Sequence, residues 1–196
     1  MKNFIRLFSL IAIISTSSSC ALMEKFKSKK PAEPLDYLEN ATKFDFKKFF
    51  TGDVEAFAIK QGEDGKIIGT STIKISGKWD ENKGVVQQNF LFNDGSKDSR
   101  TWLVTINQDG TFDAVGHDVA TAAAGKQIGN AAQSKYSLMI SQKAGRQEVF
   151  FDDRMYQIDE KSMIIISNFK NKNPSKEPAD KTSSGKTIIS LKKIDK

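Results

Sequence analysis

Short runs of alternating apolar and polar residues, each ended by a turn signal, fill most of this 196-residue chain. The run VEAFAIK, from Val54 to Lys60, is interpreted as one such strand, and the polar segment QGEDGK with its Asp64–Gly65 pair follows. An Asp-Gly pair supplies the positive φ angles that a tight hairpin turn needs. Further turn signals of this kind are DENKG, NDGSKD, NQDG and SQKAGR. A period of two residues with such short connections predicts an antiparallel all-β domain.

The pattern amounts to roughly nine or ten strands, and no long segment shows the 3.6-residue period of an amphipathic helix. Strands joined by short turns form an up-and-down meander, and closing the meander removes exposed strand edges. We therefore predict an antiparallel up-and-down, lipocalin-like barrel or a strongly curved sheet. The alternation assigns these residues to the inward face: Phe57, Ile59, Ile73, Ile75, Phe90, Phe92, Trp102, Val104 and Ile106.

The first twenty residues are typical of a secretory signal rather than of the domain. Lys2 and Arg6 precede an apolar stretch that is shorter than the about 20 residues of a membrane span, and serines lead to Cys20. Cys20 is the only cysteine, so it forms no internal disulfide. Bacterial lipoprotein signals place here the cysteine whose thiol accepts a diacylglycerol group. The alternative is ordinary cleavage near Ser19 that leaves a spare thiol.

These segments predict three parts of the chain and a location. Residues 1–19 are the lipoprotein signal peptide, residues 20–40 hold the lipidated cysteine and a polar tether, and residues 41–196 form the barrel domain. A polar stretch with two prolines, residues 171–186, predicts a flexible loop before the last strand. Membrane attachment through Cys20 predicts the bacterial cell envelope. Ala21 after the cysteine favours the periplasmic face of the outer membrane.

The charge of the chain argues against nucleic acid as a partner. The net charge is +6, and the lysines are scattered through turns and both ends of the chain. A protein that binds nucleic acid concentrates its basic residues in a patch or along one helix.

Several sequence blocks resemble a bacterial envelope lipoprotein family, domain of unknown function 3833, from Phe44 to about Phe169. The blocks are FFTGDVEAFAI, GKW, FLFNDGSKDSRTW, GHDVATAAAGKQIGNAAQSKYSL and FFDDRMYQID. The resemblance implies a lipocalin-type barrel behind a lipoprotein signal and supplies no biochemical activity. The chain departs from the family at His117, where an acidic residue is usual, and at Arg154, where tryptophan is usual.

Catalytic and metal chemistry find little support. His117 and Asp118 are adjacent, and adjacent strand residues point to opposite faces, so they do not form a dyad with each other. No G-x-S-x-G elbow is present, and one histidine with one lipidated cysteine does not make a zinc site. We therefore predict that the protein is not an enzyme and that it has no catalytic residue, no metal and no cofactor.

A polar cluster is predicted around Asp152 and Asp153, which project to opposite sides of one strand. The one inside the barrel needs a partner, for instance Arg100, because a buried carboxylate must be paired. Either a structural ion pair or a site for a ligand head group satisfies this pattern. Asn130, beside Gly129 in the small-residue segment where two strands are expected to meet at a corner, is expected to make a structural hydrogen bond.

Five aromatic residues are predicted to line a ligand pocket or to fill the barrel: Trp79, Phe90, Phe92, Trp102 and Tyr136. A barrel of about eight strands is just wide enough for either arrangement. The first functional hypothesis is a small apolar ligand, such as a lipid or fatty acid, held in the barrel. The alternative is a filled barrel that acts through its outer surface as a structural or protein-interaction lipoprotein.

Overall fold

The computed structural model describes residues 43–142, 145–172 and 183–195, all within the compact unit Glu33–Lys196. The predicted signal peptide, the predicted tether and Cys20 lie outside the described residues. Most of the loop predicted at 171–186 lies outside them as well. At its edges the structure corrects that prediction, because Asn171 ends one strand and Ser184–Lys186 begin the last one.

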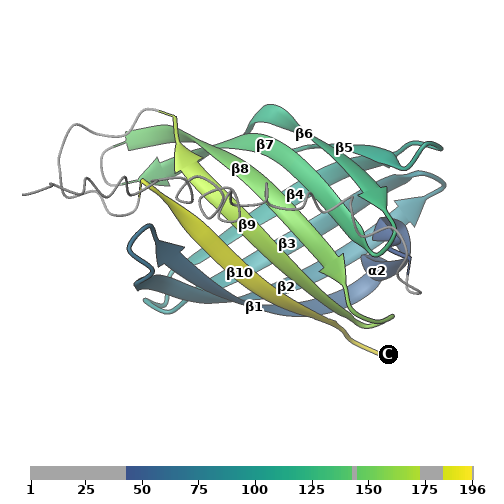
Figure 1. Ribbon diagram of the computed structural model, residues 1–196, viewed down its shortest axis with the longest axis horizontal. Coiled ribbons are helices and arrows are strands. Elements are labelled where there is room, and N and C mark those ends of the chain that lie inside the picture. The colour runs from purple at the N-terminus through teal and green to yellow at the C-terminus, as the bar shows by residue number, and fades with distance from the viewer. Residues whose placement is uncertain (1–42, 143–144, 173–182, 196) are drawn as a thin grey trace, which may run out of the picture. The chain divides into compact units, whose positions relative to one another are not determined.

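Within the described residues, ten antiparallel strands close into a barrel in which each strand pairs with its sequence neighbours and β1 pairs with β10 (Figure 1). The all-β, up-and-down prediction is confirmed, with a closed barrel rather than an open sheet. The strands are β1 (Gly52–Gly62), β2 (Ile67–Asp80), β3 (Lys83–Phe92), β4 (Lys97–Ile106), β5 (Thr111–Val115), β6 (Val119–Ile128), β7 (Ala131–Gln142), β8 (Gly145–Gln157), β9 (Ser162–Asn171) and β10 (Ser184–Lys193).

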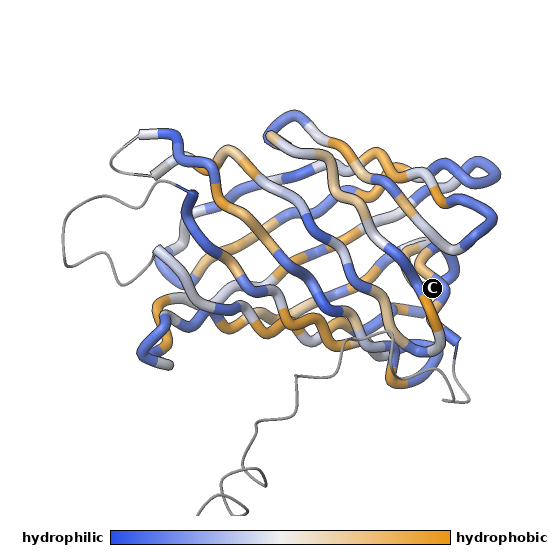
Figure 2. The backbone as a smooth tube through the Cα atoms, turned by 45° about the horizontal axis from the view of Figure 1, so that its top comes forward, coloured by the Kyte–Doolittle hydropathy of each residue, from blue (hydrophilic) through white to orange (hydrophobic). Residues whose placement is uncertain are grey.

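Hydropathy alternates along the strands, as Figure 2 shows by the change between orange and blue on the tube. Ile73, Ile75, Trp102 and Val104 face the interior as predicted, with 9% exposure or less. Since strand side chains alternate, this arrangement buries one face of each strand and leaves the other to solvent.

The predicted inward face of β1 is wrong. Phe57 is 65% exposed and Ile59 is 42% exposed, whereas Val54, Ala56 and Ala58 point inward. Both faces of this strand carry apolar residues, so the alternation by itself does not say which face is buried. The face with the smaller side chains turns inward and leaves room in the barrel, and a shift by one residue reverses every assignment.

A short helix, α2 (Phe46–Phe49), closes one end of the barrel (Figure 1). Asp45 is its N-cap, with its carboxylate accepting a hydrogen bond from the Lys48 backbone N–H at 2.8 Å. Phe46 and Phe49 are buried, and the Phe46 ring lies 5.0 Å from the ring of Phe112 on β5. The helix therefore fills the end of the barrel with aromatic side chains.

Side chains from distant strands hold α2 in place. The Asp45 N–H donates to Oε1 of Gln157 at 3.1 Å, and the Phe46 N–H donates to Oε1 of Gln127 at 3.2 Å. Nζ of Lys193 donates to the carbonyls of Lys48 and Phe49 in the last turn of the helix and of Thr51 just beyond it, at 2.6, 3.2 and 2.7 Å. These bonds satisfy backbone groups that a helix end leaves unpaired.

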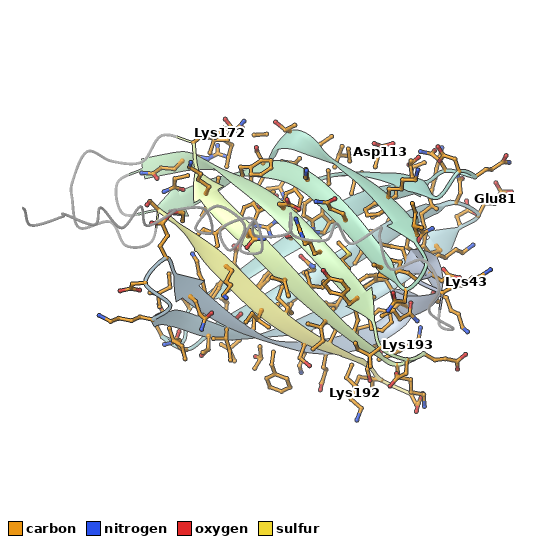
Figure 3. The ribbon with its side chains drawn as sticks, in the orientation of Figure 1. Lys43, Glu81, Asp113, Lys172, Lys192 and Lys193 are labelled. Carbon is orange, nitrogen blue, oxygen red and sulfur yellow. The ribbon has the colours of Figure 1, made fainter. Side chains whose placement is uncertain are left out.

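The opposite end of the barrel, where β1 ends at Gly62, β3 at Phe92 and β9 at Asn171, is called the distal end. Figure 3 labels Lys43, Glu81 and Lys193 near α2, and Lys172 at the distal end. The ladder between β1 and β10 runs the length of the barrel, from Val54–Lys193 near α2 to Gly62–Gly185 at the distal end.

The small-residue segment is a strand rather than the corner predicted for it. Val119–Ile128 forms β6 and pairs with β5 and β7, although register shifts interrupt its ladder with β7. Its small residues permit close packing: a Cβ on Gly125 would lie 2.2 Å from the ring of Phe112. Glycine is needed here because a larger residue would displace the Phe112 ring.

Candidate functional site: an internal cavity

A cavity of about 880 Å³ occupies the barrel interior, between α2 and the distal end. Phe46 and Phe50 form its floor at the α2 end. Lys60 and Phe92 line it toward the distal end, close to the ends of β1 and β3. This volume lies within the roughly 300–1,000 Å³ of typical small-molecule sites. The barrel is therefore not filled by its own side chains.

Most of the cavity wall is apolar. β1, β2 and β10 contribute Ala58, Ile73 and Ile189. Phe90 and Phe92 stack on β3 with ring centroids 6.0 Å apart and planes 6° apart. The wall therefore offers a large hydrocarbon and aromatic surface, which favours an apolar ligand because the apolar area removed from water stabilises the complex.

Four of the five predicted aromatic residues line this cavity: Phe90, Phe92, Trp102 and Tyr136. The Trp102 and Tyr136 rings meet edge to face at 5.3 Å. Trp79 does not line it, which corrects that assignment. Its Nε1 donates to the carbonyl of Phe50 at 3.3 Å, so its ring belongs to the packing around α2.

Polar side chains form a cluster within this apolar wall. The Tyr136 hydroxyl on β7 donates to Oδ2 of Asp153 on β8 at 2.8 Å. Nε of Arg100 on β4 pairs with Oδ2 of Asp118 at 2.8 Å, and both of these side chains are 15% exposed. Nε1 of Trp102 donates to Oε1 of Gln88 at 3.1 Å, which completes the hydrogen bonding of that indole.

Burial makes the ionised form of Asp153 less favourable than that of an exposed carboxyl group. Burial raises the pKa of Asp153 to about 6, and the nearby hydroxyls of Ser167 and Tyr136 oppose this rise only in part. Burial, followed by the charge of Asp153 beside it, also raises the pKa of the Tyr136 hydroxyl well above its ordinary value. Tyr136 therefore remains a hydrogen-bond donor throughout the physiological pH range.

The predicted pairing of Asp153 with Arg100 is not the one in the structure. Asp153 faces the interior and is bound by Tyr136, whereas Arg100 is bound by Asp118. The reason is topological. Asp118 lies in the turn between β5 and β6, close to the neighbouring strand β4, while Asp153 lies on β8 between β7 and β9.

The other residues of the predicted polar cluster lie outside the cavity. Oδ1 of Asp152 accepts from Nε2 of Gln133 at 2.7 Å, away from Asp153 because neighbouring strand residues alternate. The carbonyl of Asn130 accepts from the backbone N–H of Gln157 at 2.9 Å, in the turn between β6 and β7. His117 is exposed and its neighbour Asp118 binds Arg100.

Sequence reasoning missed several residues in and around the cavity. The sequence places Asp118 only beside His117, whereas in the structure Asp118 pairs with Arg100, which lines the cavity. Ser134 and Ser167 are buried and stand directly across from Asp153 on β7 and β9. The detectable signal was the polar residue recurring at an inward position of three consecutive strands, which becomes visible only once the register is known.

The residues that the structure describes include neither a metal-binding cluster nor a membrane-spanning helix. No group of three or more histidine, cysteine, aspartate or glutamate side chains is arranged to hold a metal ion among those residues. None of the helices in the described ranges is long and apolar enough to span a membrane.

Comparison with known proteins gives a family and a fold. A family model described as "Protein of unknown function (DUF3833)" matches residues 21–171. A solved structure of a protein of unknown function from the DUF3598 family of Nostoc punctiforme PCC 73102 is similar, with a TM-score of 0.51 and 11% identity over 78% of this chain. The match covers 50% of that protein, and at this identity the likeness concerns the fold alone. No curated protein matches the chain.

Proposed function

The chain belongs to the DUF3833 family of proteins of unknown function, and on that premise we propose that it is a lipid-anchored protein of the bacterial cell envelope that holds a small apolar ligand, such as a lipid or fatty acid, in its barrel. The role is binding rather than catalysis. The observation that carries the proposal is the cavity of about 880 Å³ with its largely apolar wall. Burial of apolar ligand surface there would supply about 25 cal/mol per Å².

The anchor and the location rest on the sequence. Cys20 follows a basic start, an apolar stretch and a run of serines, the order that precedes a lipidated cysteine. Acylation at this position would attach the barrel to a membrane surface, with the periplasmic face of the outer membrane as the proposed address. A membrane-bound carrier would then lie close to the membrane lipids from which its ligand would come.

A second candidate function is an interaction protein that works through its outer surface. Val85, Leu103 and Val115 stand side by side across β3, β4 and β5, and they are 47%, 53% and 45% exposed. A row of apolar side chains in register on the outside of a barrel is a feature of protein contact surfaces. A ligand measurement separates the two functions because only the first requires an occupied cavity.

The test of ligand binding compares two neighbouring positions on β1. We expect a chain beginning at Glu33, the start of the compact unit, to carry co-purified lipid in native mass spectrometry. Ala58→Trp places an indole ring in the cavity from a wall position and should lower the fraction of protein that carries the bound mass. Phe57→Trp, on the exposed face of the same strand, should retain it.

A bare protein mass for the wild type, together with a melting temperature that no lipid in a panel raises, would contradict the ligand proposal. That result would leave the interaction protein as the better account. Equal loss of lipid from both variants would show that the mass reflects lipid on the outer surface, since only one of the two substitutions reaches the cavity.

The lipid anchor has its own expected result. Cells that express the wild-type chain and are fed an alkyne-labelled palmitate should attach the label to the protein, and the Cys20→Ser variant should incorporate none. The wild type should remain with the membrane fraction. Equal labelling of both chains would place the acyl group on another residue and overturn the assignment of Cys20.

A further inference from the structure

One carboxylate oxygen in the cavity wall has no hydrogen-bond donor among the described residues. Oδ1 of Asp153 is buried and unpartnered, while Oδ2 of the same side chain accepts from the Tyr136 hydroxyl. Asp153 is 8% exposed and lines the cavity. A buried polar atom without a partner is unfavourable, and a donor that arrives with a ligand removes that cost.

Asp153 is the polar residue among the side chains of β8 that line the cavity. Along β8 the neighbouring cavity residues are Val149, Phe151 and Met155. Ser134 and Ser167 stand across from Asp153 on the two adjacent strands and are themselves buried. A ligand group that reaches Oδ1 therefore leaves water behind and enters a site with hydrocarbon on both sides along the strand.

The charges near Asp153 select the chemistry of that group. Arg100, the cation of the polar cluster, is engaged by Asp118 through Nε rather than by Asp153. A carboxylate or phosphate head group would bring a further negative charge beside an oxygen that needs a donor. A hydroxyl group supplies the donor without adding charge.

Resting on the proposed function, we propose that the ligand is an uncharged amphiphile whose hydroxyl group donates a hydrogen bond to Oδ1 of Asp153. Its hydrocarbon chain lies on the apolar wall that includes Ala58, Ile73 and Ile189. The head group is bound inside the barrel, next to Tyr136, and not at the distal end. This narrows the ligand class from lipids in general to neutral alcohols with a long chain.

The test uses the full chain with the uncharged fluorescent probe N-phenyl-1-naphthylamine in the cavity. Three compounds with matched chains compete for it at pH 7.5: decan-1-ol, 1-methoxydecane and decanoate. The ether keeps the oxygen of the alcohol but has no hydrogen to donate. We expect decan-1-ol to displace the probe at a concentration about tenfold lower than either of the others, because a hydrogen bond to a charged group is worth about that factor or more.

Two neighbouring variants identify the acceptor. In Asp153→Leu the ratio between ether and alcohol should fall to about one, because the acceptor is gone. In Asp152→Leu, which changes the adjacent side chain outside the cavity, the wild-type ratio should persist. If Asp153→Leu does not fold, the comparison of the three compounds on the wild type decides by itself.

Displacement by decanoate or by the ether at the same concentration as the alcohol would overturn the hydroxyl proposal while leaving ligand binding intact. An unchanged ratio in Asp153→Leu would likewise remove Asp153 as the acceptor. A probe that does not bind the wild type at all would overturn the proposed function and this inference together.

Discussion

Replacing Phe49 by alanine is expected to lower the free energy of unfolding by about 3–5 kcal/mol, the usual cost of truncating a buried phenylalanine. Phe49 is 1% exposed, and its ring packs edge to face on Phe50 at 5.2 Å. It lies in α2, a helix of four residues that has too few hydrogen bonds to be stable without packing. Urea unfolding at constant pH, followed by circular dichroism, measures the change.

Lys48→Ala is the matched control because it lies in the same helix and faces solvent. Its ion pair with Glu160 joins side chains that are 64% and 77% exposed, and such pairs contribute about 0–1 kcal/mol. A Phe49→Ala variant that loses no more stability than Lys48→Ala would contradict the assignment of α2 to the barrel core.

The fold could be predicted because β periodicity and turn chemistry act locally. The Asp64–Gly65 pair is flanked by alternating segments, and the structure places β1 and β2 around it with Gly65 at φ 76°. Turn signals of this kind separate most of the neighbouring strands. Closure of the barrel then follows from the need to pair the first and last strands.

The direction in which a strand faces was harder to predict. On β2, Ile73 and Ile75 alternate with lysine and serine, and the apolar face turned inward as predicted. On β1, alanines alternate with Phe57 and Ile59, so the larger apolar side chains indicated the wrong face. A barrel that holds a cavity places small residues on part of its inner wall, and hydrophobicity alone does not predict which face of such a strand is buried.

The candidate site could be predicted only in part because its contacts are set by strand register. Trp102 and Tyr136 are far apart in the chain, and their edge-to-face contact depends on the order of strands around the barrel. The same holds for Arg100 and Asp118, which meet across the end of the short strand β5. The residue types indicated which side chains could line a polar or aromatic site. Their contact partners could be assigned only once the order of strands in the closed barrel was known.

Asp153 is expected to make the stability of the wild type depend on pH in a way that Asp153→Asn abolishes. Burial raises the pKa of this carboxyl group from 3.8 to about 6. Between these two values the native state holds a proton that the unfolded chain has released, so stability falls as the pH rises. At about 1.4 kcal/mol for each pKa unit, the wild type should lose about 2 kcal/mol relative to Asp153→Asn between pH 4 and pH 8, because the unfolded carboxyl group is already partly ionised at pH 4.

Urea unfolding of both chains across this range measures the difference. A difference between wild type and Asp153→Asn that stays constant, or that favours the wild type as the pH rises, would show that a donor already stabilises the ionised carboxylate.

The same titration links stability to the ligand. A hydroxyl group that donates to Oδ1 of Asp153 stabilises the ionised form and lowers the pKa of the carboxyl group. Saturating decan-1-ol should therefore flatten the pH dependence of the wild type, because ligand that binds only the native state adds most stability where Asp153 is ionised. 1-Methoxydecane has no hydrogen to donate, so it should raise stability equally at all pH values. The shape of the curve thus separates a hydrogen bond to Asp153 from simple filling of the cavity.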